Sequence, residues 1–309
     1  MKLGPLWLDR PNDRSLHLRP RHKLGGLAIM IVTLTLFAIT SADLPGAVTA
    51  GCLGLVIISA IDDAINLPAT VRLASHLGAA AVAIMAIPNG NMFVGALGCV
   101  TIVWMCNLYN FMDGADGLAG GMTVIGFGAL AIAADAGGAT GLTIWCGTIS
   151  TAALAFLLFN FPPARVFMGD AGAVPLGFLA GTLGYIGFVN GVWPFWYPAL
   201  VFSPFIFDAT LTLIRRTLRG KKPWVAHREH LYQRLILSGW SHRRLALVSY
   251  AIMAATCGAA LAALSLSLLL QRVIIISVLV FLTVLMLAAE RHLHSPGRRQ
   301  TGSIGQICD

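Results

Sequence analysis

The chain has 309 residues, of which 57% are hydrophobic and only 11% are charged. A soluble domain is about 45–50% apolar and about 25% charged, and a disordered chain needs low hydrophobicity, so the composition excludes both classes. The net charge is +8. In a membrane protein an excess of Lys and Arg belongs to cytoplasmic loops. We therefore expect the lipid bilayer, and no nucleic acid, as the partner.

Ten apolar stretches are long enough, or nearly so, to cross a bilayer as helices, for which about 17–25 residues are needed. In chain order they are 24–41, 46–61, 70–87, 92–109, 118–134, 141–160, 172–190, 194–214, 245–268 and 272–289. They predict an all-α, polytopic integral membrane helical bundle, with residues 1–309 forming a single membrane domain. Five of the six cysteines lie inside these stretches, which favours small buried side chains over disulfides.

The basic residues predict the orientation of the bundle. If the N-terminus is cytoplasmic and every stretch crosses, all of the 21 Lys and Arg except Arg272 fall in cytoplasmic segments. This count predicts that both termini are cytoplasmic. The main cytoplasmic pieces are then an N-terminal segment, 9–23, and a basic loop, 215–244, that contains a His motif.

Most carboxylates lie at the predicted cytoplasmic ends of the spans, where a charge beside hydrocarbon is costly and therefore marks a functional candidate. Asp62 and Asp63 end the second span, and Arg72 follows them. Adjacent carboxylates repel unless a cation lies between them, and their oxygens suit Mg²⁺. The alternative is a solvated helix end. Asp208 is a further candidate because it lies within the eighth span.

A polar stripe follows the fourth span. Asn107, Asn110, Asp113 and Asp116 recur at every third position, so in a helix they share one slowly drifting face. The glycines after them allow a ligand to approach the backbone. Two amides and two carboxylates have little structural purpose at a membrane surface, which indicates a site.

A proline pair ends the sixth span, and Asp170 follows it between two glycines, just before the next helix. One carboxylate beside free helix N–H groups suits a metal together with a phosphate. The alternative for Asp170 is an ordinary helix N-cap.

The basic loop carries two histidines, His227 and His230, with Arg228 between them. This group could bind a diphosphate or transfer protons. Zinc ligation is not favoured because no Cys pair or HExxH pattern accompanies it. The alternative is an amphipathic surface helix on anionic lipid.

In these motifs the chain resembles the bacterial polyprenyl-phosphate N-acetylhexosamine-1-phosphate transferases of glycosyltransferase family 4. The resemblance rests on IDDAINLP at 61–68, NLYNFMDGADGLAGG at 107–121, FPPARVFMGDAG at 161–172 and HREHLYQRL at 227–235. It implies transfer of a sugar-1-phosphate from UDP-N-acetylhexosamine to undecaprenyl phosphate, with release of UMP, as the first membrane step of O-antigen or another cell-surface polysaccharide. It also implies a need for Mg²⁺, with Mn²⁺ as a substitute, and a bacterial inner-membrane location with the active site facing the cytoplasm.

The resemblance also implies roles for individual residues. Catalytic roles fall to Asp62, Asp63, Asp113 and Asp116, the metal to Asp170, and substrate binding to Asn107, Asn110, His227, Arg228 and His230. We add Arg72, which follows the aspartate pair, as a residue expected to contact a substrate phosphate. Which Asp of each pair binds metal or acts as a base stays open at this point.

Several alternatives also stay open. The phospho-N-acetylmuramoyl-pentapeptide transferases usually carry a run of adjacent histidines where this chain has HREH, which favours a simple N-acetylhexosamine. A cation-coupled transporter is a different class, but transporter sites usually lie near the midplane. The family usually has one more span before its first cytoplasmic loop; only eight residues precede Asp9, so that span is expected to be either missing or lost to a misassigned start. A homodimer is neither favoured nor excluded.

Overall fold

The computed structural model describes residues 7–9, 16, 20–40, 44–87, 91–222, 225 and 227–294, so most of the predicted segment 9–23 and Cys308 lie outside the described residues. Two short strands, β1 (Leu8–Asp9) and β2 (Arg21–His22), pair antiparallel before the first helix. The helices are α1 (Gly25–Ile39), α2 (Gly46–Ile65), α3 (Ala69–Met85), α4 (Met92–Met112), α5 (Leu118–Ala136), α6 (Thr140–Asn160), α7 (Asp170–Val189), α8 (Trp196–Val201), α9 (Ser203–Leu218), α10 (Leu231–Leu237), α11 (His242–Leu264) and α12 (Leu268–His294).

The predicted all-α membrane bundle is confirmed. Within the described residues, seven helices are long and apolar enough to cross a membrane, namely α2, α4, α5, α6, α7, α11 and α12, while α1 and α3 are shorter apolar helices. Each predicted stretch except 194–214 coincides with one helix. The number of crossings and the cytoplasmic position of the termini stay predictions.

The eighth predicted span is not one helix but two. The helical conformation is interrupted at Phe202, between the end of α8 and the start of α9. Pro204 lies in the first turn of α9, where its missing N–H costs nothing. In an unbroken helix its ring would collide with the carbonyl of Leu200, so one straight span through this segment is excluded.

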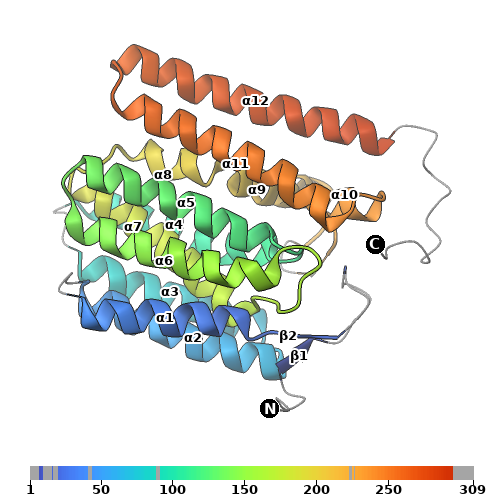
Figure 1. The fold of residues 1–309 in the computed structure, drawn as a ribbon, viewed down its shortest axis with the longest axis horizontal. Helices are drawn as coiled ribbons and strands as arrows, with labels where there is room; N and C mark the ends of the chain where they lie inside the picture. Colours follow the sequence, from blue (N-terminus) through green and yellow to red (C-terminus); the bar gives the residue numbers. More distant parts are fainter. Residues whose placement is uncertain are drawn as a thin grey trace.

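Helix α7 lies in the middle of the bundle, with α1, α2 and α3 towards one edge and α11 and α12 towards the other (Figure 1). It is buried from Ala171 to Gly187. A Cβ on Gly177 would lie 2.2 Å from the Met105 carbonyl oxygen of α4, and one on Gly172 would lie 2.3 Å from a Cα of α1. Because lipid supplies no hydrophobic force between helices, such close backbone contact at small residues is a main source of association.

We expect Gly177→Ala to destabilise the bundle because the added methyl group forces α7 away from α4. Overpacking of this kind costs about 1–3 kcal/mol, which corresponds to a melting temperature lowered by roughly 2–6 °C. The measurement is thermal unfolding in detergent. The control is Gly147→Ala in α6, where an added Cβ meets no atom within 4 Å; equal melting temperatures for the two variants would contradict this account of the α4–α7 contact.

Candidate functional site

Three predicted carboxylates meet where α2 and α4 end and α7 begins. Asp63 Oδ2 accepts a hydrogen bond of 3.1 Å from the backbone N–H of Ala171, in the first turn of α7. The Asn110 side-chain amide lies near the Asp170 carboxylate. Asp113 lies close enough to Asp170 and Asp63 for their charges to act on it. The structure thus brings together residues from three separate sequence motifs.

The carboxylate centre (Asp63, Asp113 and Asp170) carries more negative charge than the positive charge of the neighbouring Lys23 can neutralise. Burial, and then the charges of Asp170 and Asp63, raise the pKa of Asp113 well above its ordinary value. Lys23 Nζ lies 3.6 Å from Asp63 Oδ1, and that buried oxygen accepts no hydrogen bond from the described residues. One lysine offsets only part of the negative charge of three carboxylates. A divalent cation bound between them would offset the rest and stabilise their ionised forms.

The donor set of this centre fits Mg²⁺, a hard cation that prefers oxygen ligands. In the described part of the chain, no three His, Cys, Asp or Glu side chains are arranged to hold one ion by themselves. Mg²⁺ is commonly bound by one or two carboxylates, with waters and substrate phosphates completing its shell. The centre therefore suits an ion bound together with a phosphate. The assignment of Asp170 as metal ligand stays a prediction.

Gly169 allows α7 to begin this close to Asp63. Its φ is +73°, a conformation that favours glycine, and a Cβ there would lie 2.9 Å from Asp63 Oδ2. The preceding loop is anchored to α1, because the Gly26 N–H donates to the Met168 carbonyl at 2.9 Å. Asp170 therefore lies between two fixed points, Met168 held by α1 and Ala171 held by Asp63.

Asp62 and Asp63 have different partners, as expected for helical neighbours about 100° apart. Asp62 is buried and accepts hydrogen bonds from the Leu67 N–H at 2.6 Å and from Arg72 Nη1 at 3.3 Å. Its charge nevertheless acts on both Asp63 and Asp170. Asp62 therefore binds the chain that follows α2 and the Arg72 side chain, whereas Asp63 belongs to the carboxylate centre.

Asp116 and Asn107 lie on the predicted stripe but make other contacts. Asp116 Oδ2 accepts from the Ala164 N–H at 2.9 Å, and Oδ1 lies 3.5 Å from His242 Nδ1. Asn107 donates to the Val103 carbonyl of its own helix at 2.8 Å. Asp116 thus connects the turn after α4 to the loop after α6 and to α11. Sequence reasoning missed His242, which no motif marks.

The two histidines of the basic loop pack against the same helix end. The rings of His227 and His230 lie 4.8 Å apart, and His230 stacks on Phe111 of α4 with ring centroids 5.8 Å apart. The Tyr232 hydroxyl donates to the Phe111 carbonyl at 2.9 Å. Since Phe111 precedes Asp113 by two residues, the His motif lies next to the carboxylate centre.

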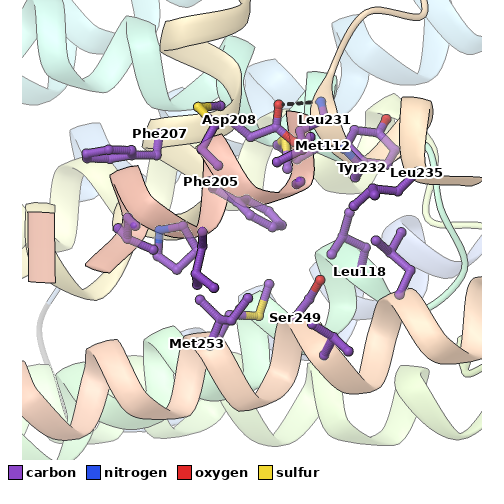
Figure 2. A pocket seen from close by; sticks show the side chains of 18 of the residues that line it. Met112, Leu118, Phe205, Phe207, Asp208, Leu231, Tyr232, Leu235, Ser249 and Met253 are labelled. Atoms are coloured by element: carbon purple, nitrogen blue, oxygen red, sulfur yellow. Dashed lines mark hydrogen bonds between the residues drawn. The ribbon is translucent and has the colours of Figure 1, made fainter. Parts of the chain in front are cut away.

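Asp208 of α9 anchors this motif. It is buried on the wall of an apolar cavity of about 350 Å³ among α9, α10, α11 and α12 (Figure 2). Its oxygens accept hydrogen bonds from the N–H groups of Leu231 and Tyr232, at 2.8 and 3.1 Å, and Oδ1 lies 3.6 Å from His230 Nδ1. These are contacts that cap the start of α10. The sequence predicts a functional role for Asp208 because a carboxylate within a span is costly. These capping contacts give a structural reason for its presence there.

An ion-pair cluster joins the end of α9 to Glu229 of the His motif. The buried Arg216 pairs with Glu229, and Lys221 Nζ lies 2.9 Å from the same carboxylate. Burial alone would raise the pKa of Glu229, but the Lys221 hydrogen bond and the Arg216 charge lower it overall. The neighbouring Arg228 is half-buried and has no hydrogen bond or ion pair with the described residues, so its guanidinium is available to a ligand.

The protonation of His227 gives a test of this packing. Burial, His230 and Arg216 lower its pKa from 6.5 to about 4. The unfolded chain therefore binds this proton more readily than the fold, so the stability from neutral His227 is complete above pH 6.5 and is lost as pH falls towards 4. We expect His227→Gln to flatten this part of a plot of melting temperature against pH. Parallel curves for both proteins would contradict the assignment.

Comparison with known proteins identifies the family of this chain. The sequence profile of glycosyl transferase family 4 matches residues 45–188. A probable undecaprenyl-phosphate N-acetylglucosaminyl 1-phosphate transferase of Bacillus subtilis is 32% identical, over 82% of this chain and 75% of its own. The undecaprenyl-phosphate alpha-N-acetylglucosaminyl 1-phosphate transferase of Escherichia coli K12 is 27% identical, over 77% and 71%. The decaprenyl-phosphate N-acetylglucosaminephosphotransferase of Mycolicibacterium smegmatis is 29% identical, over 78% and 71%. The chain therefore belongs to glycosyl transferase family 4, with the polyprenyl-phosphate N-acetylhexosamine-1-phosphate transferases.

Proposed function

We propose that this protein transfers N-acetylhexosamine-1-phosphate from a UDP-sugar to undecaprenyl phosphate. An oxygen of the lipid phosphate attacks the sugar-linked phosphorus, the bond from that phosphorus to the bridging oxygen breaks, and UMP leaves. The observation that carries the proposal is the meeting of Asp63, Asp113 and Asp170 at the ends of apolar helices. The relatives compared above are named for N-acetylglucosamine, so this is the first sugar to test.

The carboxylate centre supplies what phosphoryl transfer needs most, which is positioning and neutralisation of charge. Asp170 would hold Mg²⁺ together with the substrate phosphates, and the charges of Asp63 and Asp113 would favour the ion there. Mg²⁺ bound at this place would offset the charge that develops on the diphosphate. The Asn110 amide lies near Asp170 and offers that carboxylate a hydrogen-bond donor. Lys23 adds a fixed positive charge beside Asp63.

The cationic residues around the centre are suited to the two phosphate substrates. Arg228 presents a guanidinium for the nucleotide diphosphate, since guanidinium groups bind phosphate through paired hydrogen bonds. Its neighbour His227 is neutral at pH 7 and can therefore hydrogen-bond to the substrate without adding charge. Arg72, held by Asp62, offers a second positive group at the inner end of α3.

The lipid substrate requires an apolar surface beside the centre. The apolar cavity in Figure 2 is lined by Met112 and Leu118, which flank the turn that carries Asp113. This cavity is where isoprenoid units of the acceptor would lie. We place the reaction at the cytoplasmic face of the bacterial inner membrane and, because its product is a lipid-linked sugar, at the first membrane step of a cell-surface polysaccharide such as O-antigen.

The test is a reconstituted assay with purified protein, undecaprenyl phosphate and Mg²⁺. UDP-N-acetylglucosamine, UDP-N-acetylgalactosamine, UDP-glucose and UDP-N-acetylmuramoyl-pentapeptide are supplied one at a time, and UMP and lipid-linked product are measured. We expect UMP with an N-acetylhexosamine donor only, dependent on the lipid, abolished by EDTA and restored by Mg²⁺ or Mn²⁺. No product with any donor would contradict the proposal, and product with the pentapeptide donor alone would assign the alternative substrate.

A further inference from the structure

A second cavity, of about 360 Å³, is polar and lies where α9, α10 and α12 approach one another. It is lined by Thr212, Arg215, Arg219, Glu229, Arg234, Glu290 and His294. It contains none of the carboxylates of the centre described above, and it lies outside the segment 45–188 that matches the family profile. The proposed reaction gives it no role.

An ion-pair network forms one wall of this polar cavity. Glu290 of α12 accepts a hydrogen bond of 2.6 Å from Arg215 of α9, and two more, of 2.6 and 2.8 Å, from Arg234 of α10. These bonds hold three helices together around one carboxylate. The exposed side chain of Arg219 makes no hydrogen bond or ion pair with the described residues.

The polar cavity and its immediate neighbours carry an excess of positive charge. Glu229 is already paired with Arg216 and Lys221, and Glu290 with two further arginines. Arg219 adds one more cation, so the cavity and its neighbours hold five Lys and Arg side chains against two carboxylates, and His294 also lines the cavity. Guanidinium groups that remain accessible bind phosphate oxygens well because their N–H groups form a planar fork. The cavity therefore favours a phosphate-bearing anion.

Exposed apolar residues lie within one helical turn of residues that line the polar cavity. Leu218, one residue before Arg219, has 82% of its surface exposed, and Ile214 before Arg215 has 48%. Leu287 of α12, three residues before Glu290, is 51% exposed. Exposed apolar side chains within one helical turn of basic side chains are typical of the level where lipid headgroups meet hydrocarbon. A soluble phosphate would use the cations alone, whereas a phospholipid would use both surfaces.

We propose that this polar cavity binds the phosphate headgroup of an anionic phospholipid, with the acyl chains along the exposed faces of α9 and α12. Arg219 makes the decisive contact, since its guanidinium is not engaged elsewhere in the described chain. The bound lipid would stabilise the junction of α9, α10 and α12. This inference concerns lipid binding and does not depend on the transferase reaction.

The test uses the full-length protein, delipidated in detergent, and measures its melting temperature in mixed micelles with increasing phosphatidylglycerol. Parallel titrations use phosphatidylcholine and inorganic phosphate. Arg219→Gln removes the proposed contact without breaking the Glu290 network. Arg243→Gln is the matched control, because Arg243 is an exposed arginine in the first turn of α11 and does not line the cavity.

We expect phosphatidylglycerol, but not phosphatidylcholine or inorganic phosphate, to stabilise the wild-type protein. The half-saturating phosphatidylglycerol fraction should rise about fivefold in Arg219→Gln, since one basic residue near a membrane surface contributes about 1 kcal/mol, and less than twofold in Arg243→Gln. Equal effects of the two variants, or no stabilisation of the wild type, would overturn the site. Stabilisation by inorganic phosphate that Arg219→Gln removes would instead assign a soluble anion and overturn the lipid.

Discussion

Asp170→Asn is expected to lower UMP release by on the order of 10²–10³-fold, the size of effect seen when one group that stabilises transition-state charge is lost, while the melting temperature changes little. Asparagine has nearly the same shape as aspartate and keeps one side-chain oxygen near the Asn110 amide. It also relieves the repulsion between Asp170 and the neighbouring Asp63 and Asp113. The change therefore removes a charge that the proposed metal needs without removing a contact that the fold needs.

Two further measurements make this result specific. Asp135→Asn is the matched control, because Asp135 is an exposed residue near the end of α5 and the charge change is identical; we expect wild-type activity. Stabilisation by Mg²⁺ in the presence of UDP-N-acetylglucosamine should be present in the wild type and in Asp135→Asn but absent in Asp170→Asn. Near-normal turnover in Asp170→Asn would show that this carboxylate does not hold the metal.

The second large effect is expected for Asp208→Ala, in which the melting temperature should fall markedly, unlike in Asp170→Asn. Asp208→Ala leaves the N–H groups of Leu231 and Tyr232 without their acceptor, and each unsatisfied buried group costs about 1–3 kcal/mol. A total of about 2–4 kcal/mol corresponds to a melting temperature lowered by roughly 4–8 °C. UMP release should fall as well, because the start of α10 and the adjacent His230 lose their anchor.

The conservative variant Asp208→Asn distinguishes a role of Asp208 in capping α10 from a role as an acid in the reaction. Asp208→Asn retains one carbonyl oxygen, and asparagine is nearly as good a capping residue as aspartate, so it should recover at least half of the lost melting temperature and most of the activity. If both variants kept wild-type stability and neither released UMP, Asp208 would be a residue of the reaction and its capping role would be secondary.

The positions of the helices could be predicted well because hydropathy is a local property of the chain. The stretch 194–214 shows the limit of that signal. Apolar residues continue across the break at Phe202, so a hydropathy reading joins α8 and α9, although Pro204 is present to indicate the break. Backbone geometry, rather than apolar character, decides where the helix ends there.

The sequence by itself determined the fold class, the family, and which carboxylates and histidines are available for chemistry. Only the tertiary structure decided that Asp63 rather than Asp62 contacts α7, and that Asp116 and Asp208 make structural contacts. Asp63 and Ala171 are 108 residues apart, and Asp116 and His242 are 126 apart. Local periodicity describes which face of a helix a residue occupies, whereas these contacts depend on which distant helix packs against that face.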